Sequence, residues 1–138
     1  MHVNSIEHIA IAVKNLDESI NFYENTFGLK CYLIEEVVDQ KVRTAFFNVG
    51  GTKIELVEST DSQGTIAKFI EKHGEGIHHI AFAVNDVESS LKELESKGIK
   101  LIDRTPRPGA EGLDIAFLHP KSTLGVLTEL CKEKLKDK

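Results

Sequence analysis

An internal repeat is the feature of this sequence that most restricts its fold. The segment IEHIAIAVKNLDESI (residues 6–20) aligns with IHHIAFAVNDVESSL (residues 77–91) at a constant offset of 71 positions and without a gap. Seven of the 15 aligned positions are identical, whereas unrelated segments of average composition would share about one. The chain is therefore expected to contain two copies of one structural module, at about residues 4–60 and 76–131.

Each copy has the pattern of a strand, a helix and three further strands. Residues 5–13 and 77–84 are apolar and compatible with a strand, and each is followed by an apolar stripe with helical spacing that ends at a glycine, Gly28 or Gly98. The remaining strands are predicted at 29–37, 42–49 and 53–58 in the first copy, and at 99–103, 113–118 and 125–131 in the second. The glycines at 50–51 indicate a hairpin turn, and residues 107–112 a longer loop.

These elements predict an α+β fold in which two tandem β-α-β-β-β modules are related by a pseudo-two-fold axis. One open sheet cannot bury its inner face alone, so the two modules are expected to form a curved mixed sheet around a metal-binding cleft. Residues 1–138 would then be a single domain. A linker helix is expected within about 61–75, and the tail at 132–138 receives no function.

Composition narrows the range of functions. The 138 residues carry a formal net charge of −5, which gives no basic field for nucleic acid. No apolar stretch approaches the ~20 residues that span a bilayer, and the first residues do not resemble a signal peptide. The only two cysteines, Cys31 and Cys131, are interpreted as small core residues in a reducing compartment. We expect a cytoplasmic protein that binds neither nucleic acid nor membrane.

Two histidines and two glutamates occupy corresponding positions in the two copies. The first strands hold His8 and His79, and the last strands hold Glu55 and Glu129. Each residue alone would usually be a hydrogen-bonded strand histidine or an edge carboxylate. Their symmetric placement favours joint binding of one divalent metal ion, with open positions for water or substrate. His78 competes with His79, but the repeat aligns His8 with His79 and strand alternation puts His78 on the other face.

The His…Glu…His…Glu pattern on paired modules resembles the vicinal oxygen chelate (glyoxalase/bleomycin resistance/dioxygenase) superfamily. Within it, TKIELVE (52–58), TIAKFIEKHGEGIHHIAFAV (65–84) and FLHPKSTLGVLTEL (117–130) resemble the methylmalonyl-CoA epimerase family. The resemblance covers residues 4–131. It implies an isomerase that interconverts (2R)- and (2S)-methylmalonyl-CoA by removing the C2 proton through a metal-stabilised enolate.

The resemblance also implies which residues and partners take part. The ion is expected to be Co²⁺, although the ligand set also suits Ni²⁺, Zn²⁺ or Mn²⁺, and epimerases often carry glutamine at the position of Glu55. The substrate would be an acyl-CoA and the assembly a homodimer. The family's metal ligands fall on His8, Glu55, His79 and Glu129.

The same resemblance makes Glu129 the first catalytic base. Inversion at C2 needs a proton acceptor on one face and a donor on the other, so two groups are expected. Some bacterial relatives have a non-ligand glutamate that aligns near Thr44, and a hydroxyl cannot replace it as a base at neutral pH. Symmetry offers Glu55 as the second base, with a metal-bound water as the alternative.

Two other functions compete with this one. Glyoxalase I uses the same metal cage, but its usual DPDG-like turn is replaced here by HPK at 119–121. A non-catalytic small-molecule-binding protein of the same fold usually lacks the metal ligands, whereas all four are present. Candidates for contact with coenzyme A phosphates are Lys121, Arg104 and Arg107.

Overall fold

The computed structural model describes residues 1–133, which contain eight strands and three α-helices. Contacts divide these residues into two compact units. The first unit is residues 8–78, and the second combines residues 1–7 with residues from 79 onward. The boundaries fall inside two strands, β1 (Ser5–Ala12) and β5 (Gly76–Val84), so each of these strands contributes to both units.

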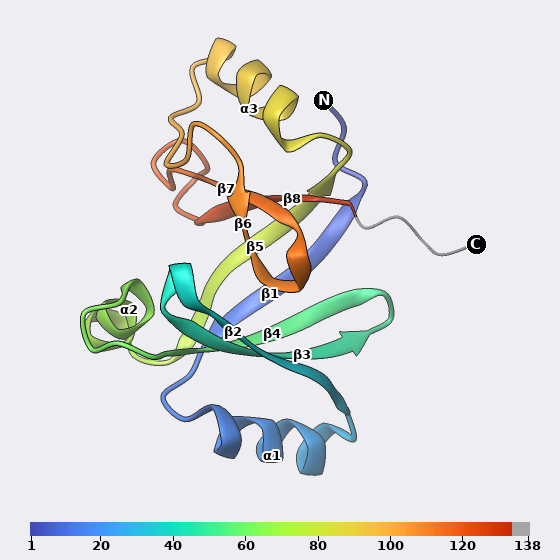
Figure 1. Cartoon of the computed structure of the whole chain (residues 1–138), viewed down its shortest axis with the longest axis vertical. Helices are drawn as coiled ribbons and strands as arrows, with labels where there is room; N and C mark the ends of the chain where they lie inside the picture. Colours follow the sequence, from blue (N-terminus) through green and yellow to red (C-terminus); the bar gives the residue numbers. More distant parts are fainter. Residues whose placement is uncertain (134–138) are drawn as a thin grey trace. The chain divides into compact units, whose positions relative to one another are not determined.

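In the first unit, four strands form a sheet in the order β2-β3-β4-β1. β1 runs parallel to β4, while the other neighbours are antiparallel. Figure 1 shows α1 along one face of this sheet. The elements after β1 are α1 (Leu16–Phe27), β2 (Cys31–Val37), β3 (Val42–Val49), β4 (Thr52–Ser59) and α2 (Thr65–His73).

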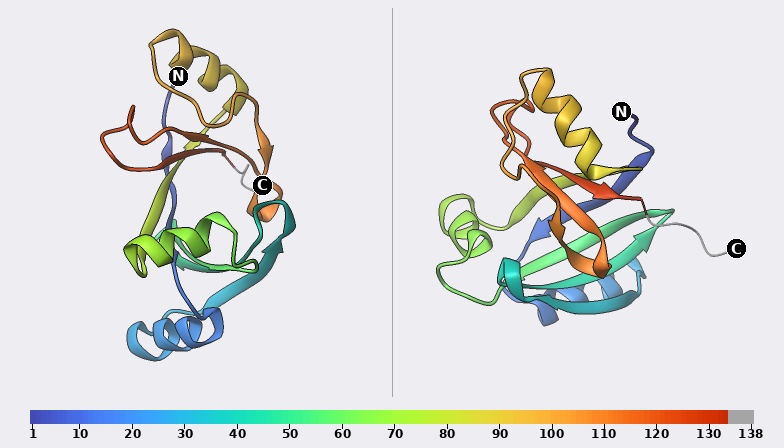
Figure 2. Two further views of the ribbon diagram at one scale, coloured as in Figure 1. Left: turned by 90° about the vertical axis from the view of Figure 1, so that its left-hand side faces the viewer. Right: turned by 45° about the horizontal axis from the view of Figure 1, so that its top comes forward.

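The second unit repeats this arrangement, with the strand order β5-β8-β7-β6 and β5 parallel to β8. α3 packs beside β7 and β8 (Figures 1 and 2). Both the α+β fold and the two β-α-β-β-β modules predicted from the sequence are thereby confirmed. The elements after β5 are α3 (Val87–Ser96), β6 (Arg107–Pro108), β7 (Asp114–Leu118) and β8 (Thr128–Lys132).

The repeat extends to the caps of the two corresponding helices. Asn15 accepts a hydrogen bond from the Glu18 backbone N–H (3.0 Å) before α1, and Asp86 accepts one from the Ser89 N–H (2.9 Å) before α3. These side chains satisfy backbone donors that the first helical turn leaves open. Gly28 ends α1 in the left-handed conformation, at φ 67°, as its position in the sequence predicted.

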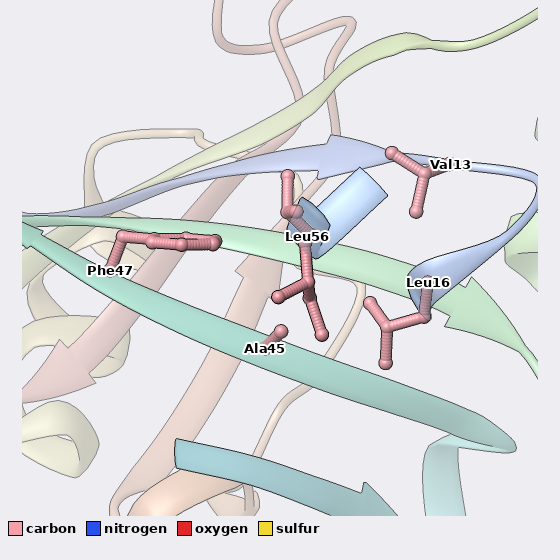
Figure 3. Close-up of a cluster of buried hydrophobic side chains, with 6 residues drawn as sticks. Val13, Leu16, Ala45, Phe47 and Leu56 are labelled. Atoms are coloured by element: carbon pink, nitrogen blue, oxygen red, sulfur yellow. The ribbon is translucent and has the colours of Figure 1, made fainter. Parts of the chain in front are cut away.

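A buried apolar cluster joins α1 to its sheet. Val13, Leu16, Ala45, Phe47 and Leu56 point toward one another in Figure 3. Leu56 lies in the middle of β4 and is fully buried. Because Glu55 is its neighbour in the chain, this cluster fixes the strand that carries one of the candidate ligands.

Replacing Leu56 with alanine should lower the free energy of unfolding by about 2–5 kcal/mol, since the substitution removes buried methyl groups and leaves a cavity. Chemical denaturation followed by circular dichroism measures the change. The exposed Val38 supplies the matched control, because Val38→Ala should change the free energy of unfolding by no more than about 0.5 kcal/mol. An equally small effect of Leu56→Ala would contradict its place in the core.

Two predicted strands of the second module differ from the structure. Residues 99–103 are not a strand and make a single bridge, between Leu101 and Leu118, while the two-residue β6 lies in the predicted loop at 107–112. Backbone hydrogen bonds still join this segment to the end of β7, from the Ile102 N–H to the Phe117 carbonyl and from the His119 N–H to the Lys100 carbonyl. The Phe117 N–H, however, donates to the Asp103 carboxylate instead of to a backbone carbonyl. β8 begins at Thr128 rather than at 125, because the preceding residues form turns that end at Gly125, with φ 87°.

The two cysteines and the C-terminal tail were also assigned from the sequence. Cys131 is buried in the core and Cys31 is partly buried, and neither forms a disulfide. Of the predicted tail, Lys132 ends β8, and residues 134–138 lie outside the described part of the chain. Within residues 1–133, no helix is both long enough and apolar enough to cross a membrane.

Candidate metal centre

The first unit brings His8 and Glu55 together. In the parallel pairing of β1 with β4, Ala10 lies opposite Glu55, and His8 is two positions before Ala10. Alternate residues share one face of a sheet, so both side chains project from the same face. His8 Nε2 lies 3.4 Å from Glu55 Oε1, and each residue is only 6% exposed.

The second unit builds the same pair from β5 and β8. Ala81 lies opposite Glu129, and His79 is again two positions earlier. His79 Nε2 lies 3.4 Å from Glu129 Oε1, at exposures of 6% and 3%. The two units therefore each bury one imidazole against one carboxylate, at equivalent places in the fold.

Each glutamate also lies opposite a phenylalanine on the neighbouring strand, and a lysine or arginine side chain lies over the ring of that phenylalanine. Phe46 pairs with Glu55 across β3 and β4, and Lys53 Nζ lies 6.0 Å from its ring centre. In the second unit, Phe117 pairs with Glu129 across β7 and β8. The Arg107 guanidinium lies 5.5 Å from the Phe117 ring centre, and His79 contacts this ring edge-on at 5.1 Å.

Of these four surrounding residues, only Arg107 was identified from the sequence, as a candidate contact for coenzyme A phosphates. A signal for two of them was present, since Phe46 and Phe117 are themselves 71 positions apart and continue the repeat. A phenylalanine in a strand is normally interpreted as core, so its place beside a carboxylate emerges only from the strand register.

The proposed coenzyme A contacts have different surroundings. Arg107 pairs with Asp103 at 3.3 Å and contacts Phe117 beside the His79–Glu129 pair. Arg104 is exposed and pairs with Glu95 of α3. Lys121 lies in the exposed turn after β7, where its backbone N–H donates to His119 Nδ1.

The residues that competed for a role at the site lie elsewhere or lack the required chemistry. His78 packs edge-on against Phe69 of α2, with ring centres 4.9 Å apart. Thr44 is fully buried on β3, two positions from Phe46 and on the same face, and its hydroxyl donates to the Glu35 carbonyl at 3.3 Å. The position aligned with the glutamate of some relatives thus holds a hydroxyl that is already hydrogen-bonded.

The donor types fit a divalent metal ion. Among the described residues, the buried side chains of His8, His79 and Glu129 are candidates for holding such an ion. Imidazole nitrogen and carboxylate oxygen are ligands that cobalt, nickel, zinc and manganese all accept. Burying an imidazole and a carboxylate side by side is costly, and a cation held by such a pair would offset the negative charge of its carboxylate.

Comparison with known proteins establishes the family. A sequence model of the Glyoxalase/Bleomycin resistance protein/Dioxygenase superfamily matches residues 7–117. The chain belongs to this superfamily, as its sequence pattern predicted.

Individual relatives within this superfamily include proteins named as methylmalonyl-CoA epimerases. An uncharacterized Bacillus subtilis protein, YqjC, is 45% identical over 96% of this chain and 94% of its own length. The mitochondrial methylmalonyl-CoA epimerase of Dictyostelium discoideum is 40% identical over 93% of this chain and 78% of its own. A variant of Streptomyces coelicolor methylmalonyl-CoA epimerase, solved in complex with 2-nitronate-propionyl-CoA, is 35% identical, covers 99% of both chains and superposes with a TM-score of 0.94.

Proposed function

We propose that this protein is a metal-dependent methylmalonyl-CoA epimerase that interconverts the (2R) and (2S) forms of its acyl-CoA substrate. The main support is that each unit contains an equivalent, buried His–Glu contact. The chain is also similar to named epimerases over nearly its full length. Glyoxalase I remains the second candidate, because it would use the same ligand types. Similarity to the epimerases in both sequence and structure favours the first.

We assign one divalent ion to both pairs, with His8, Glu55, His79 and Glu129 as its ligands. When bound, the ion would supply Lewis-acid stabilisation of the negative charge that develops beside C2 during proton removal. The two modules would then act as one domain, because a single ion takes ligands from each. The low exposure of all four side chains supports this assignment, since water is largely kept away from the proton being transferred.

The protein's own carboxylates move the proton. The ionised Glu129 takes the C2 proton, and the electron pair of the broken C–H bond moves to the adjacent carbonyl. A protonated Glu55, which in that form would not be a ligand of the ion, returns a proton to C2 from the opposite face and so inverts the centre. Glu129 ends protonated and Glu55 ionised, so the enzyme is then set for the reverse reaction. Positioned acid–base groups of this kind contribute about 10²–10⁴ in rate.

Three finer assignments accompany this proposal. The ion is Co²⁺ and the assembly is a homodimer, both as the family resemblance implies. The cellular location is the cytoplasm, which is supported by the low cysteine count of two in 138 residues. Ni²⁺, Zn²⁺ and Mn²⁺ satisfy the same donors, so reconstitution with each ion, followed by assay, tests the choice of metal.

Deuterium incorporation at C2 of methylmalonyl-CoA tests the function. The metal-free and cobalt-loaded proteins are incubated in D₂O with substrate, and exchange is followed by NMR after subtraction of the non-enzymatic rate. We expect exchange that depends on the ion, because proton removal is the common step of both directions. A glutathione hemithioacetal is the comparison substrate. No exchange at full metal occupancy would contradict the proposal, and turnover of the hemithioacetal instead would favour glyoxalase I.

A further inference from the structure

A groove of about 590 Å³ lies on the first unit, at the end of the sheet where β3 turns into β4. Within the described residues, its lining contains two lysines and no carboxylate. The whole chain carries a net charge of −5, so this local excess of positive charge runs against the overall balance. The polar side chains of the lining are Lys30, Tyr32, Asn48 and Lys53.

One residue of the lining, Lys53, links the groove to the His8–Glu55 pair. Lys53 is the direct cross-strand partner of His8 and lies two positions before Glu55 on β4. Residues two positions apart on a strand share a face and lie about 7 Å apart. A molecule whose reacting end is held at His8 and Glu55 could therefore extend along β4 past Lys53 into the groove.

Two irregularities of the strands shape the groove. The register between β2 and β3 shifts between Cys31 and Leu33, and this bulge carries Tyr32. Bulges redirect side chains, and here the Tyr32 ring lies 6.2 Å from the Phe46 ring while remaining 47% exposed. Tyr32 thus presents an aromatic surface to solvent on the same face as Lys53.

The hairpin supplies the other wall. Gly50 and Gly51 both have positive φ, 60° and 95°, which suits the tight turn that joins β3 to β4. The Gly51 N–H donates to Asn48 Oδ1 at 3.0 Å. Because its oxygen is already engaged, Asn48 offers its Nδ2 protons as donors to a ligand.

We propose that this groove binds the phosphorylated adenine nucleotide of the coenzyme A thioester, an inference that rests on the proposed function. Lys30 and Lys53 supply ammonium groups for phosphate oxygens, and Asn48 supplies an amide donor. The exposed ring of Tyr32 supplies a stacking surface for the base, as aromatic side chains do for nucleotides generally. In this proposal the coenzyme A phosphates bind to side chains on and beside the sheet near the candidate ligands, and not to loop residues such as Arg104.

Equilibrium binding tests the groove independently of catalysis. Isothermal titration calorimetry would compare coenzyme A, adenosine 3′,5′-bisphosphate and inorganic phosphate on the full-length protein. We expect Lys30→Ala to weaken coenzyme A binding about fivefold, and Lys30→Ala combined with Lys53→Met about thirtyfold, because each lysine contributes a charge-assisted contact. Methionine keeps an apolar stem over Phe46. The matched control is Lys92→Ala on α3, an exposed lysine outside the groove, which should leave affinity unchanged.

The other ligands separate a nucleotide site from a phosphate site. Tyr32→Leu should weaken adenosine 3′,5′-bisphosphate at least threefold and leave inorganic phosphate unaffected, because only the nucleotide stacks on the ring. Unchanged coenzyme A affinity in the double lysine variant would overturn the proposal. So would equal affinity of the wild-type protein for inorganic phosphate and the bisphosphate.

A truncated substrate separates this inference from the proposed function. Lys30→Ala should raise KM for methylmalonyl-CoA about fivefold with little change in kcat, and should leave KM for methylmalonyl-pantetheine, which lacks the nucleotide, unchanged. Equal effects on both substrates would overturn the groove assignment. Absence of C2 exchange with either thioester would instead contradict the epimerase function, while the calorimetric comparison would still decide what the groove binds.

Discussion

Replacement of Glu129 by glutamine should slow interconversion of (2R)- and (2S)-methylmalonyl-CoA by about 10²–10⁴-fold, the usual contribution of a positioned acid–base group. The amide has nearly the same shape as the carboxylate but cannot accept a proton at neutral pH. Glu129 is buried and lies 3.4 Å from His79, so the substitution removes the acid–base group from a confined position. The rate is measured from the change in epimer ratio, with metal content determined on the same sample.

The Glu55→Gln variant makes the test specific for two bases. If Glu129 and Glu55 serve opposite faces of C2, each glutamine variant should still exchange the C2 proton of one epimer with D₂O, and the epimer should differ between them. Both variants should lose interconversion. Normal interconversion by Glu55→Gln would contradict its role and favour a metal-bound water as the second group.

The control for both variants is Glu95→Gln. Glu95 is an exposed α3 residue that pairs with Arg104, so its replacement should alter neither exchange nor interconversion. Loss of activity in this control would indicate a general effect of charge rather than loss of a base. Retention of full activity by metal-loaded Glu129→Gln would contradict the proposed mechanism outright.

The sequence predicted those parts of the fold that depend on local chemistry. The end of α1 at Gly28 was predicted because glycine adopts the left-handed conformation that closes a helix without steric cost. The alternation of strand residues separated His79 from His78, and the structure places these two in different surroundings. Such signals lie within a few residues of one another, so a repeated segment shows them twice.

Features set by long-range pairing were harder to foresee. Residues 99–103 have the composition of a strand, yet Asp103 uses its carboxylate on the Phe117 N–H, and only Leu101 makes a bridge. The groove beside Lys53 depends on the bulge at Tyr32, and the bulge depends on how β2 meets β3. Nothing in the sequence near Lys30 or Tyr32 indicates that these side chains line the same groove.

The candidate metal ligands were predicted partly from local sequence signals and partly from long-range strand pairing. Each histidine was identified from the aligned segment, but each glutamate lies beyond it, at an offset of 74 rather than 71 positions. The parallel pairings of β1 with β4 and of β5 with β8 bring each glutamate to its histidine with the same register. The prediction of His–Glu pairs therefore used the order of the strands in the repeated module, not the spacing in the sequence.

The number of metal ions per chain should be one, and replacement of either histidine should weaken the binding of that ion. We expect His8→Ala and His79→Ala each to reduce cobalt affinity by more than about a hundredfold, which exceeds the 10–100-fold typical for loss of a group that only supports a ligand. The reason is that each variant removes a direct nitrogen donor from the same ion, although the two histidines belong to different units. Titration against a chelator of known affinity gives both stoichiometry and affinity.

Two separate ions, one on each His–Glu pair, would give a different result. The wild-type chain would then bind two equivalents, and each alanine variant would lose one of them while the other kept its full affinity. With a single shared ion, both variants weaken the same site, and the effect of the double variant is smaller than the product of the two single effects because the site is already disrupted. His73→Ala is the matched control, since His73 is an exposed residue at the end of α2 that packs on Phe69, and it should leave cobalt binding unchanged. Two equivalents per chain would contradict the shared site, and with it the requirement that both modules act on one substrate.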